Sequence, residues 1–267
     1  MVDLLSLDAK VAIVTGGGNG MGERAALTLA ARGAAVVVAD IDDANGQRVV
    51  DDILAAGGRA LFHHADMTVP ESVSDLVATT VGEFGGIDIL DNNAAALGLT
   101  RVDGSLLETT QETFEATLLA NVGGPFLMCQ KIIPVMIERG GGSIVNIASV
   151  SALAGELSLT AYGVSKAALA QLTRAIATQF GPAGIRCNSV APSYVSTRNN
   201  AAGAPPEVER VYLRHTPTGH IVSPQDVAEV VAFLASDAAR QINGQLIPVD
   251  GGLRAAASTV ADMRDIG

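Results

Sequence analysis

The sequence predicts an α/β protein in which a doubly wound, seven-stranded parallel sheet carries helices on both faces. Short runs rich in β-branched residues alternate with longer segments of helical periodicity, which is the order produced when crossover helices join parallel strands. Most of the short runs are apolar on both faces, as a sheet covered on both sides requires. A glycine-rich segment follows the first run directly, at the strand-to-helix turn where such sheets bind phosphate groups.

The elements follow one another in a regular order along the chain. The strands are expected at residues 11–15, 35–40, 60–64, 87–92, 143–148, 186–190 and 246–249. The helices are expected at residues 20–32, 43–56, 70–84, 110–139, 161–180 and 224–236. Three stretches, residues 94–108, 192–222 and the tail from 253, carry no regular pattern, and long loops in a compact fold are more often functional than idle.

The ends of the expected helices carry sequence signals. Ser223 followed by Pro224 is typical of an N-cap and a first helical residue. A glycine follows the final turn of five helices, where the left-handed conformation that ends a helix favours this residue. These five are Gly33, Gly57, Gly85, Gly140 and Gly181.

Composition excludes several classes of protein. Hydrophobic residues make up 48% of the chain and charged residues 17%, so the chain can bury a core. No uncharged run reaches the roughly 18 to 20 residues that span a bilayer. The net charge of −11 disfavours nucleic acid and anionic membranes as partners. The cysteine and histidine spacing predicts neither a disulfide nor a metal site, and the N-terminus lacks the pattern of a signal peptide, so we expect a cytoplasmic protein.

The loop after the first strand reads Thr15-Gly16-Gly17-Gly18-Asn19-Gly20-Met21-Gly22 and runs into a helix. Its pattern is TGxxxGxG, not GxGxxG. Backbone N–H groups and the helix N-terminus can hold a pyrophosphate there, whereas a tight turn alone needs only one or two glycines.

Asp40 ends the second expected strand, about 20 residues beyond Gly20, where a carboxylate accepts both ribose hydroxyls of an adenosine. The same carboxylate would repel a 2′-phosphate. No Lys or Arg occurs at residues 17–19 or at Ile41 to neutralise that phosphate. Asp40 therefore favours NAD over NADP. The alternative is that Asp40 binds no cofactor and is a solvated turn residue together with Asp42 and Asp43.

Tyr162 and Lys166 lie four residues apart at the start of an expected helix, so their side chains share one face. A nearby cation favours phenolate, and we expect Lys166 to lower the pKa of Tyr162. The spacing of Tyr162 and Lys166 alone is weak evidence for a catalytic pair. However, Ser149 lies thirteen residues before Tyr162, at the carboxyl end of an apolar strand and on the side of the sheet where ligands bind. Ser151 competes with Ser149 for this role, and either serine could instead cap a loop.

From Lys10 to Gly252 the sequence resembles the short-chain dehydrogenase/reductase family, whose fold is Rossmann-like. The departures are Ala95 and Ser193 where the family has glycine, Met21 where it usually has isoleucine, and Asp91 in an otherwise apolar strand. The motifs that agree in order and spacing are Gly16–Gly22, Asn92-Asn93-Ala94-Ala95, Asn121, Ser149, Tyr162 with Lys166, Pro192-Ser193 and Asp250-Gly251-Gly252.

The resemblance implies a role for each site residue. Tyr162 would be the general acid/base, Ser149 would fix the substrate oxygen, and Lys166 would tune the phenol and hold ribose hydroxyls. Asn121 would anchor a water behind Lys166; independently, Pro125 lacks an N–H and so deprives the Asn121 carbonyl of its helical partner. The expected cofactor-binding residues are Gly16, Asn19, Gly20, Met21, Gly22, Asp40, Ile41, Asp66, Met67, Asn93, Ala94, Tyr162, Lys166, Pro192, Val195 and Thr197.

We interpret residues 1–267 as a single dinucleotide-binding and catalytic domain, with a substrate loop at about 193–222 and a tail at 253–267. The expected activity is NAD-dependent hydride transfer between a neutral, largely apolar secondary alcohol and its ketone, because the loops around Ser149 and Tyr162 are apolar and poor in cations. The resemblance also implies a small-molecule substrate and a homo-oligomer, a tetramer first.

Three alternatives stay open at this point. An NADPH-dependent 3-oxoacyl carrier-protein reductase is disfavoured by Asp40. A catalytically silent NAD-sensing regulator is disfavoured by the intact Ser149, Tyr162 and Lys166. A sugar-nucleotide epimerase or dehydratase would share the Tyr-x-x-x-Lys motif but normally carries a larger C-terminal substrate domain, for which this chain has no room.

Overall fold

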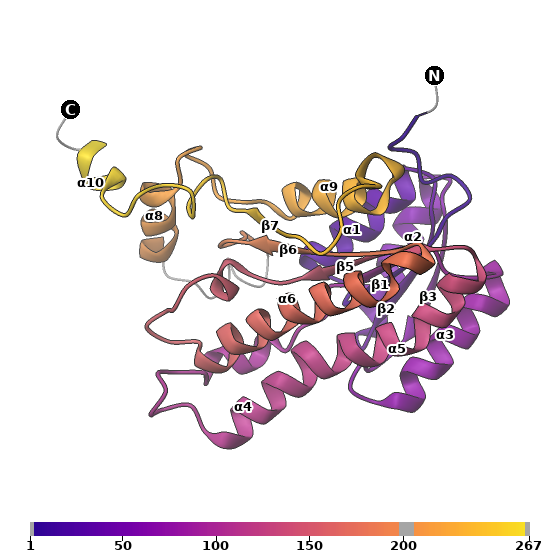
Figure 1. The fold of residues 1–267 in the computed structure, drawn as a ribbon, viewed down its shortest axis with the longest axis horizontal. Coiled ribbons are helices and arrows are strands. Elements are labelled where there is room, and N and C mark those ends of the chain that lie inside the picture. The colour runs from indigo at the N-terminus through magenta and orange to yellow at the C-terminus, as the bar shows by residue number, and fades with distance from the viewer. Residues whose placement is uncertain (1–2, 198–205, 265–267) are drawn as a thin grey trace.

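The computed structural model describes residues 3–197 and 206–264 and contains a seven-stranded parallel sheet, which confirms the expected fold class. The strand order is β3-β2-β1-β4-β5-β6-β7 (Figure 1). The strands are β1 (Val11–Thr15), β2 (Ala35–Asp40), β3 (Arg59–His64), β4 (Ile89–Asn92), β5 (Gly142–Ile147), β6 (Ile185–Pro192) and β7 (Leu246–Val249). Every expected strand is present within two residues at either end.

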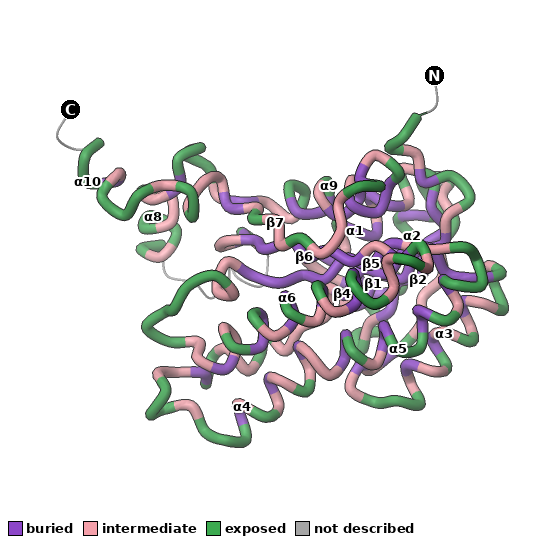
Figure 2. Tube along the Cα trace, in the orientation of Figure 1, coloured by how far each residue is buried: buried purple, intermediate pink, exposed green. Residues whose placement is uncertain are grey.

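Helices cover both faces of the sheet, and two separate apolar clusters form the core. On one face α1 (Gly20–Ala31), α2 (Asp43–Ala55) and α9 (Pro224–Ala235) pack on the strands. On the other face lie α3 (Pro70–Phe84), α5 (Gly124–Glu138) and α6 (Thr160–Phe180). Figure 2 shows buried strands between helices whose outer sides are exposed.

The expected helix at 110–139 is in fact broken. It consists of α4 (Gln111–Leu118), a π-helical turn at Leu119–Gly123, and α5. Pro125 follows this turn and has no N–H to donate to the carbonyl four residues earlier, so the wider turn relieves a bond that a continuous α-helix could not make.

Two of the stretches without a sequence pattern contain helices. The helix α8 (Pro206–His215) lies within the expected substrate loop, and α10 (Val260–Arg264) lies within the tail. Both are short and exposed, and Arg214 of α8 forms an ion pair with Asp262 of α10 at 2.6 Å. Residues 198–205 of the expected loop and 265–267 of the tail lie outside the described residues.

The helix ends agree with most of the sequence signals. The four residues Gly33, Gly57, Gly85 and Gly140 have positive φ angles of 79° to 100°. The prediction for Gly181 is wrong: its φ is −53°, because a short 3₁₀ turn continues from α6 and the left-handed residue is Gly184, with φ 81°. Ser223 caps α9 in a reciprocal capping box with Asp226.

Among the described residues, Gln111–Glu138 alone has the length and hydropathy of a membrane-spanning helix. Met128, Ile132 and Met136 on α5 are fully buried in the cluster between this helix and the sheet. That burial is typical of a core helix.

Asp91 is a charged residue type inside the sheet. It lies on β4 between Val14 of β1 and Val145 of β5, with no exposed surface. Within the described part of the chain neither carboxyl oxygen has a hydrogen-bond partner, and burial raises the pKa of Asp91 to about 8.

The sheet order changes direction at β1, which pairs with β2 on one side and with β4 on the other. Ligands of open α/β sheets bind beyond the carboxyl ends of the strands at this switch point. The functional site is therefore expected where β1 and β4 end, at Thr15 and Asn92.

Candidate active site

A cavity of about 610 Å³ opens at the carboxyl ends of the strands. Gly16 follows β1, Asn93 follows β4 and Ser149 follows β5, while Asp40 and Pro192 end β2 and β6. The cavity therefore crosses the switch point. Its other lining residues from the expected set are Asn19, Gly20, Met21, Ile41, Asp66, Met67, Ala94, Tyr162, Lys166, Val195 and Thr197.

Two expected residues do not line the cavity. Gly22 lies behind the glycine loop, where an added Cβ would approach the Gly16 carbonyl oxygen to 2.1 Å, so it allows α1 to pack closely on the loop. The side chain of Asn121, in the π-helical turn, accepts a bond from the Ala96 N–H at 2.9 Å and donates to Ser165 Oγ at 3.0 Å. Asn121 thus joins the loop after β4 to α6, and the water bridge to Lys166 stays a prediction.

The glycine loop forms one end of the cavity. Gly16 and Gly20 have φ angles of 63° and 58°, which favour glycine, and a Cβ on Gly16 would meet the backbone of Ala94 at 3.0 Å. Asn93 holds the loop by donating its side-chain N–H to the carbonyls of Thr15 and Gly16 at 3.3 and 3.2 Å. The buried Oδ1 of Asn93 has no partner among the residues that the structure describes, so an acceptor remains for a bound molecule.

Asp40 lies beside this loop, where its Oδ2 accepts the Gly18 N–H at 2.8 Å. The structure also brings Arg48 of α2 to the loop, where it donates to the Gly18 carbonyl at 3.1 Å, a contact that the sequence did not indicate. Glu23 and Asp52 pair with this guanidinium at 2.9 and 3.4 Å, and Arg48 is not a lining residue. Its charge is therefore already matched by two carboxylates.

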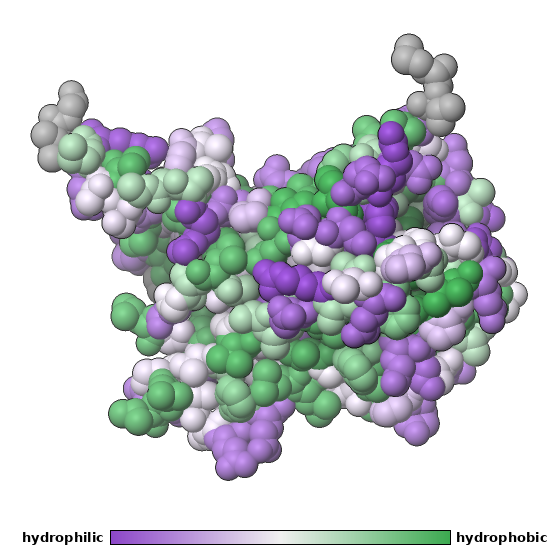
Figure 3. Space-filling view, viewed as in Figure 1, coloured by the Kyte–Doolittle hydropathy of each residue, from purple (hydrophilic) through white to green (hydrophobic). Residues whose placement is uncertain are grey.

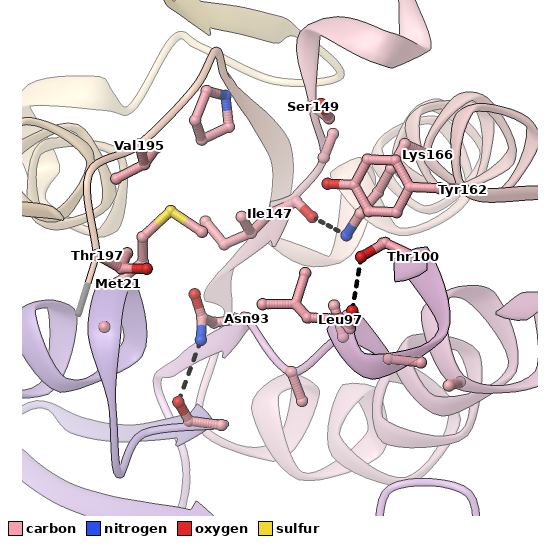
Figure 4. A pocket seen from close by; sticks show the side chains of 18 of the residues that line it. Met21, Asn93, Leu97, Thr100, Ile147, Ser149, Tyr162, Lys166, Val195 and Thr197 are labelled. Carbon is pink, nitrogen blue, oxygen red and sulfur yellow. Dashed lines mark hydrogen bonds between the residues drawn. The ribbon is translucent and has the colours of Figure 1, made fainter. Parts of the chain in front are cut away.

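Ser149, Tyr162 and Lys166 meet at the other end of the cavity (Figure 4). Tyr162 and Lys166 come from the first two turns of α6, and the Lys166 Nζ lies 5.6 Å from the centre of the Tyr162 ring. The Tyr162 hydroxyl points into the cavity, while Met21, Val195 and Thr197 form the opposite wall. Lys166 donates to the Ile147 carbonyl at 2.7 Å.

Burial governs the acidity of both α6 side chains. It raises the pKa of Tyr162, and a hydrogen bond with Ser149 acts in the opposite direction. It lowers the pKa of Lys166 to about 8. The expected lowering of the Tyr162 pKa is therefore not found here, because withdrawal of the phenol from water is the largest influence on that pKa.

Asp103 was not singled out in the sequence, yet it holds the start of α6. Leu159, at the N-cap position, has a φ of 65° and provides no capping side chain. Asp103 caps the helix instead, because its carboxylate accepts the N–H groups of Ala161 at 3.0 Å and Tyr162 at 2.8 Å. The only signal in the sequence is that Leu159, just before the helix, cannot cap it. This signal does not reveal which distant residue provides the cap.

The substrate side of the cavity is mainly apolar, but it contains a carboxylate. Glu156 accepts a hydrogen bond from Ser151, and both residues line the cavity. Tyr194 and Tyr212 stack there with their ring centres 5.1 Å apart. The other lining residues at this end are Ala95, Ala96, Leu97, Thr100, Val150, Leu159 and Ser193.

The residues present fit a dinucleotide. The glycine loop allows close approach of a pyrophosphate, Asn93 retains a buried acceptor, and Asp40 can accept ribose hydroxyls. The volume of about 610 Å³ lies within the range of cofactor pockets.

Comparison with known proteins agrees with this geometry. A family model described as enoyl-(acyl carrier protein) reductase matches residues 16–254. A probable short-chain type dehydrogenase/reductase of Bradyrhizobium diazoefficiens is 42% identical over 96% of this chain and 91% of its own. The 7alpha-hydroxysteroid dehydrogenase of Escherichia coli K12 is 37% identical over 94% of this chain and 96% of its own.

A solved structure of 7alpha-hydroxysteroid dehydrogenase, complexed with NADH and 7-oxo glycochenodeoxycholic acid, superposes with a TM-score of 0.90. It is 36% identical in sequence to this chain, and the match covers 94% of this chain and 98% of that one. The likeness therefore extends over the sheet, the cavity and both ends of the site.

Proposed function

Because the chain belongs to the short-chain dehydrogenase/reductase family, we propose that it is an NAD-dependent oxidoreductase that interconverts a neutral, largely apolar secondary alcohol and its ketone. The observation that carries the proposal is the meeting of Ser149, Tyr162 and Lys166 at one end of a cavity whose other end is the glycine loop beside Asp40.

Tyr162 moves the proton in this proposal. Its raised pKa keeps the phenol protonated at neutral pH, which suits donation to a ketone oxygen. Ser149 donates its hydroxyl hydrogen to the same oxygen and so stabilises the charge that develops there. A nicotinamide ring bound at this end of the cavity accepts or supplies the hydride.

Lys166 binds and orients rather than transferring the proton itself. The Ile147 carbonyl holds its Nζ at 2.7 Å, and a pKa of about 8 leaves most of the amine protonated at pH 7. The ammonium can then donate to ribose hydroxyls beside Tyr162.

The lining of the cavity supports a neutral substrate. Among the described lining residues Lys166 is the only Lys or Arg, whereas Asp40, Asp66 and Glu156 are acidic. An anionic substrate would lose its hydration without gaining a bidentate Arg partner. Apolar side chains at the substrate end, including Leu97, Val150 and Leu159, favour an alicyclic or steroid-like carbon frame.

The preference for NAD rests on Asp40. Its carboxylate lies beside the glycine loop, and the nearby Arg48 is paired with Glu23 and Asp52. A 2′-phosphate there would meet an unpaired carboxylate. We expect at least about a tenfold advantage of NAD(H) in kcat/KM, which corresponds to about 1.4 kcal/mol.

A turnover screen of secondary alcohols and ketones with NAD(H) and with NADP(H) tests the proposal. Neutral alicyclic ketones should be the best substrates, and the double change Asp40→Ala with Ile41→Arg should move the preference toward NADP(H). Equal efficiency with both cofactors would refute the NAD assignment. A keto acid or acyl thioester that outperforms every neutral ketone would refute the substrate assignment.

We also propose that the protein is cytoplasmic, which the composition of the chain supports. We further propose a homo-oligomer, with a tetramer as the first choice, and the exposed apolar residues of α5 support this point.

A further inference from the structure

Ser151 and Glu156 form a polar subsite within the apolar end of the cavity. Both residues lie in the segment between β5 and α6, and both line the cavity close to Ser149. Ser149 Oγ donates to Ser151 Oγ at 3.1 Å, and Ser151 Oγ donates in turn to Glu156 Oε1. The chain of hydrogen bonds therefore runs from the residue that fixes the substrate oxygen to a carboxylate.

Ser151 and Glu156 can accept further hydrogen bonds but have no hydrogen left to donate. A serine hydroxyl has one hydrogen to donate, and a carboxylate has none. Ser151 donates its hydrogen to Glu156, so its oxygen can only accept further hydrogen bonds. When Ser149 turns its own hydrogen toward a substrate oxygen, Ser151 also loses the donor that it has in this structure.

Among the described lining residues the only Lys or Arg is Lys166, and its Nζ donates to the Ile147 carbonyl. The charge of Glu156 acts to raise the pKa of Tyr162 and of Tyr212, so this carboxylate acts on both the reacting phenol and one member of the stacked tyrosine pair. A substrate that fills this end of the cavity must pass beside two acceptors.

We propose that Glu156 and Ser151 are specificity-determining residues that bind a second hydroxyl group of the substrate. This inference rests on the proposed function and narrows its substrate class from secondary alcohols to diols and hydroxyketones. Because the two serine oxygens lie 3.1 Å apart, the second hydroxyl belongs on the carbon next to the reacting carbon or one carbon further. The rest of the substrate stays apolar and neutral.

Matched alcohols test the assignment. Oxidation of cyclohexanol, cyclohexane-1,2-diol and cyclohexane-1,3-diol should be measured with NAD for the wild type, Glu156→Leu, Glu156→Gln and Ser151→Ala. In the wild type we expect the better diol to exceed cyclohexanol at least about tenfold in kcat/KM, mainly through a lower KM. Glu156→Leu should abolish that ratio, because the diols lose the acceptor of their second hydroxyl and cyclohexanol has no such hydroxyl.

Glu156→Gln should give an intermediate ratio, because the amide keeps one acceptor oxygen, and Ser151→Ala should also lower it. Glu83→Gln is the matched control: Glu83 is exposed on α3, outside the cavity, and its change should leave every ratio as it is.

Three results would overturn the inference and leave the proposed function standing. One is an unchanged diol preference in Glu156→Leu, another is an equal loss of activity on cyclohexanol and on the diols, and the third is a stronger preference for 2-aminocyclohexanol than for the diol, since Glu156 would then recognise a cation. If the wild type oxidises none of these alcohols and reduces none of their ketones, the proposed function fails, and this inference fails with it.

Discussion

Tyr162 is a phenol withdrawn from water, and this burial is the largest influence on its pKa. The Tyr162→Phe variant removes only the hydroxyl and should lower kcat by about 10² to 10⁴. Because the phenol acts on the substrate oxygen, binding of NADH should stay within a few-fold, as measured by calorimetry. Lys166→Ala, by contrast, should weaken both turnover and NADH binding.

The assignment of Tyr162 depends on this separation of binding from turnover. A Tyr162→Phe enzyme that keeps more than about a hundredth of the wild-type rate would place the general acid/base elsewhere.

Asp91 should make the stability of the protein depend on pH. Its pKa is about 8 in the folded state against 3.8 in the unfolded chain, so the folded state holds a proton that the unfolded state releases between those values. Stability from this group is therefore complete below about pH 4 and is lost as the pH rises toward 8. The cost at pH 7 is at most about 4 kcal/mol.

Asp91→Asn, which resembles the protonated acid in shape, should remove this dependence. Urea denaturation should give similar stabilities for the two proteins at about pH 4 and a more stable variant at pH 8. Parallel pH profiles for wild type and variant would show that Asp91 is not the source.

The sequence indicates local chemistry well at this scale and distant contacts poorly. Tyr162 with Lys166 and Ser149 can be found because one helix and one strand end position them. Arg48 at the Gly18 carbonyl and Asp103 at the start of α6 meet their partners only through the tertiary fold. The direction of the Tyr162 pKa shift also depends on burial, which spacing does not reveal.

At the scale of elements, the start of α6 depends on a residue outside the helix. Asp103 accepts the first N–H groups of this helix and is itself held by the Thr109 hydroxyl at 3.0 Å. Asp103→Ala should destabilise the protein by about 1 to 3 kcal/mol, because two N–H groups at the helix start lose their acceptor.

The same change should lower kcat, because Tyr162 lies in the first turn of α6 and small displacements of a catalytic group are costly. Asp103→Asn keeps one acceptor oxygen and should lose less stability and less activity than Asp103→Ala. Thr109→Val is a control that leaves the bonds from Asp103 to α6 in place. An Asp103→Ala protein with wild-type melting temperature and kcat would contradict this role.

Elements of strong periodicity are predictable, and the misses have physical causes. The strands β1, β2 and β7 have the expected bounds because each is a short apolar run between turn signals. The 110–139 segment has continuous helical periodicity, and only the missing N–H of Pro125 indicates the π-helical turn. The helix α8 has no fully buried residue, so no core-facing stripe marks it within its loop.

At the scale of the whole molecule, hydrophobic side chains remain on one outer face. Figure 3 shows them gathered where α4, α5 and α6 run, and Leu119, Phe126, Ile137 and Val164 are 42% to 54% exposed. A helix face of this kind is usually covered by another subunit. We expect a homotetramer, measured by light scattering with size-exclusion chromatography at micromolar concentration.

Phe126→Glu should weaken that assembly, because a carboxylate at the centre of the face would be buried without a partner. A wild-type protein that elutes and scatters as a monomer would refute the prediction.

The chain has no tryptophan and three tyrosines, and Tyr162, Tyr194 and Tyr212 all line the cavity. Its intrinsic tyrosine emission therefore arises only from the walls of the active site. Ligands that enter the end of the cavity lined by these tyrosines will change the emission of an unlabelled protein, and Tyr162→Phe leaves the stacked pair as the only remaining emitters. Ligand binding can therefore be followed by the intrinsic fluorescence of the protein. The difference between the wild type and Tyr162→Phe separates the emission of Tyr162 from that of Tyr194 and Tyr212.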